Sequence, residues 1–210
     1  MLRRLSALPL AALVAVACGT EPPLHLIQNG GFETGTFTSW TTFDAVNGDT
    51  LGFFVTADTV LPESMDTVLA APEGSYAAIT DQGGSGTHVL YQDVILPPNR
   101  TATLTAIIYI QSDATFVNAA TAGLAHDGGE SNQQVRVDVM NPAAGVTDVG
   151  TGVLLNVYRS QPADPLVTSY IHLTADLSPF AGQTVRIRFA EVDNQSFLHL
   201  GVDSVDVVVD

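Results

Sequence analysis

The sequence predicts an all-β protein in which two antiparallel sheets pack face to face as a β-sandwich. Hydrophobic and polar residues alternate in several short runs, most clearly where arginines separate Val185, Ile187 and Phe189. This period of two is typical of half-buried antiparallel strands. Clusters of Gly, Pro, Asn and Asp separate the runs, and no long amphipathic helix is predicted between them. About ten short strands, without helices to cover a parallel sheet, favour a two-sheet sandwich.

The first 17 residues are typical of a signal peptide. Arg3 and Arg4 precede a short apolar run at residues 5–17, which is too short to cross a bilayer as a stable helix. Small residues then lead to Cys18, the only cysteine, and this arrangement resembles the bacterial lipobox. The resemblance implies that Cys18 is lipidated, that residues 18–23 form a tether, and that the exported protein is anchored to the outer membrane or cell surface. The alternative is an ordinary signal peptide with a chance cysteine, and mass spectrometry of the membrane fraction would distinguish the two.

The strong negative charge excludes some classes of partner. The chain carries 22 acidic residues against seven basic ones, which gives a formal net charge of −15. Nucleic-acid binding needs basic patches that neutralise phosphates, so nucleic acid is not an expected partner. The same charge disfavours docking on anionic lipid, and contact with a membrane is therefore expected only through the lipid anchor.

Residues 24–210 are predicted to form a single β-sandwich domain, because strand-like runs continue to the C-terminus without a linker. Alternating runs surround Val137 and Val207, in addition to the run around Ile187. The other predicted strands are residues 24–28, 51–56, 76–80, 88–96, 102–111, 153–159 and 169–177. A Gly-Gly-Ser-Gly-Thr sequence at residues 83–87 lacks the last glycine of a nucleophile elbow, and it is interpreted as a flexible hairpin turn.

The two ends of this domain carry a recognisable pattern. Asn-Gly-Gly-Phe-Glu at residues 29–33 is followed by Gly35 and Trp40, and the last strand contains Val-Asp-Ser-Val at residues 202–205. The pattern resembles the galactose-binding-like jelly rolls, which include several carbohydrate-binding module families. The resemblance implies a jelly-roll topology in which the first and last strands lie together. Its motifs identify a fold and do not specify a ligand.

The resemblance also implies a structural Ca²⁺ site where the two ends meet. Its ligands would be the carboxylates of Glu33 and Asp203, with a backbone carbonyl near Gly31. Carboxylate and carbonyl oxygens are the ligands that this hard cation prefers. The alternative is that Glu33 binds backbone amides and Asp203 caps a turn of the strand.

Aromatic side chains are the candidate carbohydrate contacts. Trp40 has two interpretations, stacking on a sugar ring or filling the core behind the first strand. Tyr91, Tyr109 and Tyr170 are out of phase with the apolar residues of their strands, and they are our candidate ligand-binding residues. Each tyrosine also has the alternative of packing against protein.

Catalysis is not predicted, because no catalytic or metal-binding motif stands out. The five histidines are scattered without the spacing of a zinc site. No pair of carboxylates stands out on an apolar strand, and Asp93 and Asp138, which lie in strand-like runs, are expected to face outward. The predicted function is a non-catalytic surface module that binds carbohydrate. The alternative is a structural or adhesive surface protein that binds other proteins.

Overall fold

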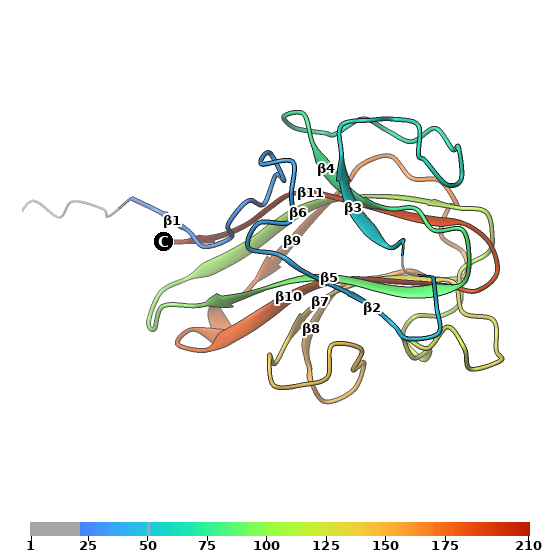
Figure 1. Ribbon diagram of the computed structural model, residues 1–210. Helices are drawn as coiled ribbons and strands as arrows, with labels where there is room; N and C mark the ends of the chain where they lie inside the picture. Colours follow the sequence, from blue (N-terminus) through green and yellow to red (C-terminus); the bar gives the residue numbers. More distant parts are fainter. Residues whose placement is uncertain (1–21, 50) are drawn as a thin grey trace, which may run out of the picture.

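The structure is a computed structural model that describes residues 22–49 and 51–210. The predicted signal peptide and Cys18 lie outside the described residues. In the described part, two antiparallel sheets pack face to face, which confirms the predicted all-β sandwich (Figure 1). The strands are β1 (Leu24–His25), β2 (Thr41–Asp44), β3 (Phe53–Thr56), β4 (Ala77–Thr80), β5 (Gly86–Ile95), β6 (Ala102–Ser112), β7 (Gln134–Met140), β8 (Val153–Arg159), β9 (Ile171–Asp176), β10 (Thr184–Asp193) and β11 (Leu198–Val209).

The chain crosses between the two sheets at most of its connections from β4 onward. One sheet has the order β3-β4-β11-β6-β9, with β1 paired to β11, and the other has the order β2-β5-β10-β7-β8. Because β4 and β5 belong to different sheets, the segment between them crosses the end of the sandwich. The prediction of a hairpin turn at residues 83–87 is therefore wrong, and Gly86 and Thr87 are the first residues of β5.

The described residues contain one short 3-10 turn, Ser178–Phe180, as their only helical element. Within that part of the chain, no helix has the length and apolar character needed to cross a lipid bilayer.

The core lies between the sheets and includes an aromatic group from the predicted N-terminal motif. The Trp40 side chain is buried, with its ring centroid 5.3 Å from that of Phe32 and 6.1 Å from that of Phe189. Its indole N–H donates a hydrogen bond to the carbonyl of Asn29 at 3.0 Å. Burial and this hydrogen bond place Trp40 in the core and leave no ring face free for a sugar.

The two ends of the domain lie side by side, as the sequence pattern indicates. In Figure 1, β1 runs beside the C-terminal end of β11, and Leu24 is paired with Val209. Further along, the backbone N–H of Val205 donates to the carbonyl of Gly30 at 3.0 Å. The N-terminal segment therefore closes the sandwich against the last strand.

Asp138 and Asp93 both face outward from the five-stranded sheet, as expected, but loops cover the part of this face that carries Asp138. Asp138 does point away from the inter-sheet core, but its side chain is fully buried under these loops. Its carboxylate lies 2.5 Å from the Arg188 guanidinium and 3.1 Å from that of Arg136. Asp93, by contrast, is exposed and pairs with Arg186 at 2.7 Å. The strand pattern identifies which face a residue points to, whereas the loops decide whether water reaches it.

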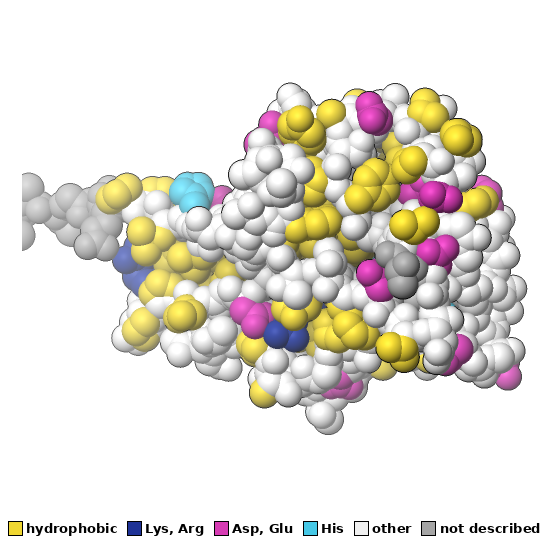
Figure 2. Space-filling view, viewed as in Figure 1, with side chains coloured by type: hydrophobic (Ala, Val, Ile, Leu, Met, Phe, Trp, Pro, Cys, Tyr) yellow, Lys and Arg dark blue, Asp and Glu magenta, His cyan; other side chains and the backbone are white. Residues whose placement is uncertain are grey.

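Acidic side chains are spread over the visible face of the molecule, and basic side chains occur there at few places (Figure 2). This distribution agrees with the net charge of −15.

Candidate functional site

The inter-sheet core becomes polar at one end of the sandwich. Along β10 the apolar residues Ile187 and Phe189 face the core, and the same alternation continues through Glu191 and Asp193. On the neighbouring strand β5, His88 is paired directly with Glu191. The side chains of all three polar residues are buried. Two acids and a histidine thus occupy positions that hydrophobic residues fill further along the same strands.

The hydrogen bonds of this cluster are incomplete. His88 Nδ1 lies 2.6 Å from a carboxylate oxygen of Asp44, and the Gln82 amide donates to Glu191 Oε1 at 3.0 Å. The backbone N–H of Gly86 donates to Asp193 Oδ1 at 2.8 Å. His88 Nε2 and Glu191 Oε2 are buried and have no hydrogen-bond partner. Buried polar atoms without partners are uncommon and point to a missing ligand or water.

The environment of the two carboxyl groups favours their neutral forms. Burial raises the pKa of Glu191 well above its usual range, and the nearby charge of Asp193 adds to the effect. Burial also raises the pKa of Asp193 to about 6, although hydrogen bonds from Gln82 and Gly86 oppose this shift. Removing carboxylates from water disfavours their charge unless a cation or donors compensate. The ionised forms of these two carboxyl groups would therefore need a cation or further donors to compensate their burial.

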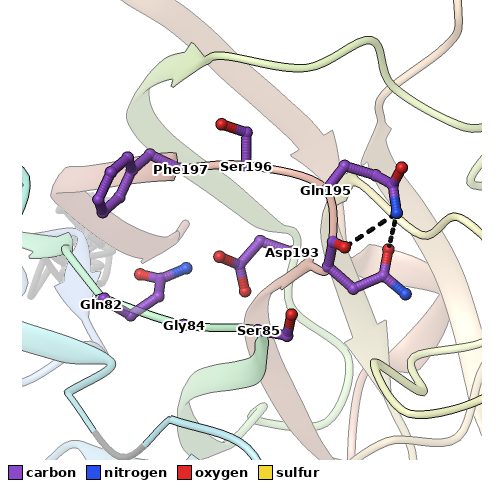
Figure 3. A pocket seen from close by; sticks show the side chains of 9 residues that line it. Gln82, Gly84, Ser85, Asp193, Gln195, Ser196 and Phe197 are labelled. Atoms are coloured by element: carbon purple, nitrogen blue, oxygen red, sulfur yellow. Dashed lines mark hydrogen bonds between the residues drawn. The ribbon is translucent and has the colours of Figure 1, made fainter.

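An open pocket of about 210 Å³ lies beside the cluster. Figure 3 shows the Asp193 carboxylate directed toward Gln82, between the 82–85 segment and the turn that carries Ser196 and Phe197. Gln195 folds back and donates to the carbonyl and side-chain oxygens of its neighbour Asn194. The pocket is lined by Gln82, Gly83, Gly84, Ser85, Asp193, Asn194, Gln195, Ser196 and Phe197. It combines amide, hydroxyl and carboxylate groups with one aromatic ring.

Two of the predicted calcium ligands, Glu33 and Asp203, lie on either side of Gly31 near the joined ends of the chain. A Cβ atom built on Gly31 would lie 3.7 Å from Asp203 Oδ1 and 3.8 Å from Glu33 Cγ, so the two acids flank this glycine. Glu33 Oε1 accepts hydrogen bonds from the backbone N–H groups of Ser75 and Tyr76, both at 2.9 Å. These bonds correspond to the alternative in which Glu33 binds backbone amides.

The surroundings of Asp203 fit a hard cation. Burial raises the pKa of Asp203 to about 6, and the charges of Glu73 and Glu33 add to this shift. Its oxygens accept backbone N–H groups at 2.6 Å from Ser204 and 3.3 Å from Glu73. The Ser204 hydroxyl beside it is buried without a hydrogen-bond partner. The Asp203 carboxylate and the Ser204 hydroxyl offer oxygen atoms of the kind that Ca²⁺ takes, whereas the Glu33 carboxylate already accepts two backbone N–H groups. Calcium binding at Glu33, Asp203 and Gly31 stays a prediction.

The three candidate tyrosines lie on the outer faces of the two sheets. Tyr91 belongs to the five-stranded sheet, and the Arg186 guanidinium stacks on its ring at 4.0 Å. Tyr109 and Tyr170 belong to a small cluster on the outside of the other sheet. The Tyr109 side chain is 5% exposed, and its hydroxyl donates to Gln111 at 2.5 Å. The structure does not bring the three together, and none of them lines the pocket beside Asp193.

Sequence reasoning missed the pocket and its polar cluster. Glu191 and Asp193 are in phase with Phe189, and this was the one signal that indicated acids inside the core. His88 is likewise in phase with Leu90 and Val94 of its strand, but nothing in the sequence indicates that it pairs with Glu191, about a hundred residues away.

Comparison with known proteins relates the chain to β-sandwich domains of several functions. No protein-family model matches the sequence, and no curated protein matches it. Among solved structures, the carbohydrate-binding module TmCBM61, determined with β-1,4-galactotriose, is 15% identical with a TM-score of 0.53, covering 88% of this chain and 97% of the module. The K3 adhesin domain of Lys-gingipain from Porphyromonas gingivalis W83 is 16% identical with a TM-score of 0.53, covering 90% and 98%.

A structure of an enzyme has a comparable similarity. The Stig cyclase Fisc from Fischerella sp. TAU, determined with an indole ligand, is 20% identical with a TM-score of 0.51, covering 90% of this chain and 98% of the cyclase. At these identities the likeness shows the fold alone, because one sandwich fold hosts unrelated functions.

Proposed function

We propose that this protein is a non-catalytic binding module whose ligand is a carbohydrate, bound in the pocket beside Asp193. The observation that carries the proposal is the composition of the pocket: three side-chain amides, two serine hydroxyls and one carboxylate surround an opening that the Phe197 ring also lines. Such groups donate and accept hydrogen bonds to sugar hydroxyls, while an aromatic face packs on the apolar face of a pyranose. A volume of about 210 Å³ suits one ring or the end of a chain.

The comparisons give some support to a binding function. The similar solved structures include a sugar-binding module and an adhesin domain, together with one cyclase. We also propose, from the sequence alone, that the protein is exported and lipid-anchored at Cys18. A lipid anchor at Cys18 would hold the domain, and with it the pocket, at the cell envelope.

The test is a glycan array probed with the full chain, followed by titration of the best glycan against variants. Phe197→Ala removes the ring at the pocket and is expected to weaken binding at least about tenfold, equivalent to about 1.4 kcal/mol. Tyr170→Phe serves as the matched control on the outer face of the six-stranded sheet, and it should bind as the unchanged protein does. Melting temperatures of both variants check that the fold is retained.

Two outcomes would count against the proposal. An array without any bound glycan favours the alternative of a structural or adhesive protein whose partners are proteins. Loss of binding in Tyr170→Phe, with Phe197→Ala unaffected, would place the carbohydrate site on the outer face of the sheet instead of in the pocket.

We propose that Ca²⁺ binds between Glu33 and Asp203 and stabilises the joined ends of the chain. A cation that binds only the folded state raises its stability, so Ca²⁺ is expected to raise the melting temperature of the chelator-treated protein. Asp203→Asn replaces one proposed ligand with a side chain of equal size and should abolish the increase. Identical melting curves with and without saturating Ca²⁺ would exclude this site.

A further inference from the structure

We propose that His88, Glu191 and Asp193 bind one divalent transition-metal ion of the Zn²⁺ class inside the polar end of the sandwich. One donor atom from each residue lies within 4.8 Å of the other two, and all three side chains are buried. This cluster is distinct from the calcium site, because its residues belong to β5 and β10 of the five-stranded sheet. The proposal is independent of whether the neighbouring pocket binds a carbohydrate.

The hydrogen bond to Asp44 prepares His88 to act as a ligand. Its Nδ1 lies 2.6 Å from the Asp44 carboxylate, and an ionised carboxylate only accepts hydrogen bonds. The proton of the neutral imidazole is therefore assigned to Nδ1, which leaves a lone pair on Nε2. That atom is buried and has no partner. A carboxylate that orients a histidine through its second nitrogen is the usual support of a metal-bound imidazole.

The two acids supply the charge that a cation would neutralise. Glu191 Oε2 is buried without a partner, and Asp193 lies two residues further along the same strand face. The groups that do bind these carboxylates, the Gln82 amide and the Gly86 N–H, are neutral. Buried carboxylates are stable when they are paired or coordinate a metal. A divalent ion would satisfy both acids and the histidine at once.

Two glycines make room for the imidazole. A Cβ atom built on Gly86 would lie 2.1 Å from His88 Nε2, and one built on Gly52 would lie 2.3 Å from His88 Nδ1. Any larger residue at position 86 would therefore collide with the nitrogen that carries the free lone pair. The absence of side chains at these two glycines therefore leaves the space that the His88 ring occupies.

The donor set selects the class of ion. One imidazole with two carboxylates suits Zn²⁺, and also Mn²⁺ or Fe²⁺, whereas Ca²⁺ takes oxygen ligands. Zinc bonds to such donors are about 2.0–2.2 Å long, so the side chains must close around the ion by a small rotation. Three protein ligands leave a fourth position open. Asp193 also lines the neighbouring pocket (Figure 3), so the proposed ion would lie next to that pocket.

The experiment uses the full chain after removal of metals with a chelator. Titration with Co²⁺, which reports its coordination by visible absorption, and competition with Zn²⁺ are expected to show one saturable ion per chain. Glu191→Gln keeps the shape of the side chain and should weaken Zn²⁺ binding at least about tenfold. Asp44→Asn, which alters the hydrogen bond that orients His88 and removes a charge near Glu191, is expected to weaken it by about 10–100-fold.

Two controls separate the site from other metal-binding groups. His126 is a buried histidine on the opposite face of β5, where it contacts Thr87, and His126→Gln should leave the Co²⁺ spectrum unchanged. Asp203→Asn removes a proposed calcium ligand and should also leave it unchanged.

Folding of the variants is checked without metal. Glu191→Gln removes an acid that burial disfavours, so its metal-free melting temperature should not fall. Loss of ion binding in a variant that melts normally supports the site. The proposal is overturned if no saturable binding occurs, or if Glu191→Gln binds Zn²⁺ as tightly as the unchanged protein.

Discussion

Replacing Asp138 with asparagine is expected to lower the free energy of unfolding by about 3–5 kcal/mol, the usual cost of removing one partner from a buried ion pair. The carboxylate lies between two guanidinium groups that are themselves buried, those of Arg136 and Arg188. Arg188 also donates to the carbonyls of Val146 and Asp148, which belong to a covering loop. Loss of the anion leaves two buried positive charges close together and weakens the attachment of the loops.

Chemical denaturation of Asp138→Asn measures this loss, with Asp93→Asn as the matched control. Asp93 forms an ion pair with Arg186 of similar geometry, but at the surface of the same sheet. An exposed pair contributes about 1 kcal/mol or less, so the control should change little. For a domain of this size, the loss at Asp138 corresponds to roughly 6–20 °C in melting temperature. Equal effects of the two substitutions would show that the buried network does not stabilise the fold.

Gly30→Ala is expected to destabilise the protein by about 3 kcal/mol, at the upper end of the cost of overpacking. A Cβ atom at this position would lie 1.9 Å from the carbonyl oxygen of Val205. The obstacle is backbone, so it cannot move aside as the end of a side chain does. The same two residues share the hydrogen bond from Val205 N–H to the Gly30 carbonyl. The substitution therefore separates the N-terminal segment from the last strand.

Thermal unfolding of Gly30→Ala checks this expectation, and Gly145→Ala is the control. Gly145 has a negative or extended φ, and a Cβ atom there meets nothing within 4 Å. At such a position alanine is neutral or stabilises by about 0.4–1 kcal/mol, because it restricts the unfolded chain. If both variants melted like the unchanged protein, close contact between the chain ends would not be needed for stability.

The strands that the sequence predicted well are those with strict alternation. The runs around Val137, Ile187 and Val207 all form strands, and their apolar residues face the core between the sheets. The strand Thr41–Asp44 was missed because its four residues, Thr-Thr-Phe-Asp, show no alternating apolar pattern. The strand predicted at residues 24–28 was too long, because the apolar residues continue past the point where the strand ends. Only Leu24–His25 forms a strand paired with β11.

The candidate site was harder to predict because its residues meet only after folding. Glu33 and Asp203 were placed near each other through a resemblance that covers both chain ends, and the structure brings them to either side of Gly31. For His88 and Glu191 no such pattern exists. They become neighbours because β5 and β10 pair in one particular register.

The local order of residues determined the all-β class and the face to which each strand residue points, because alternation is a property of neighbouring residues. Contacts between segments distant in the sequence determined whether each face of a strand is buried or exposed to solvent. Loops bury Asp138 on an outer face, whereas the paired strands enclose Glu191 and Asp193 in the core. Alternation specifies direction, but the solvent exposure and charge around a side chain depend on segments far away in the sequence. For this reason the fold class was predictable from short runs, and the polar pocket was not.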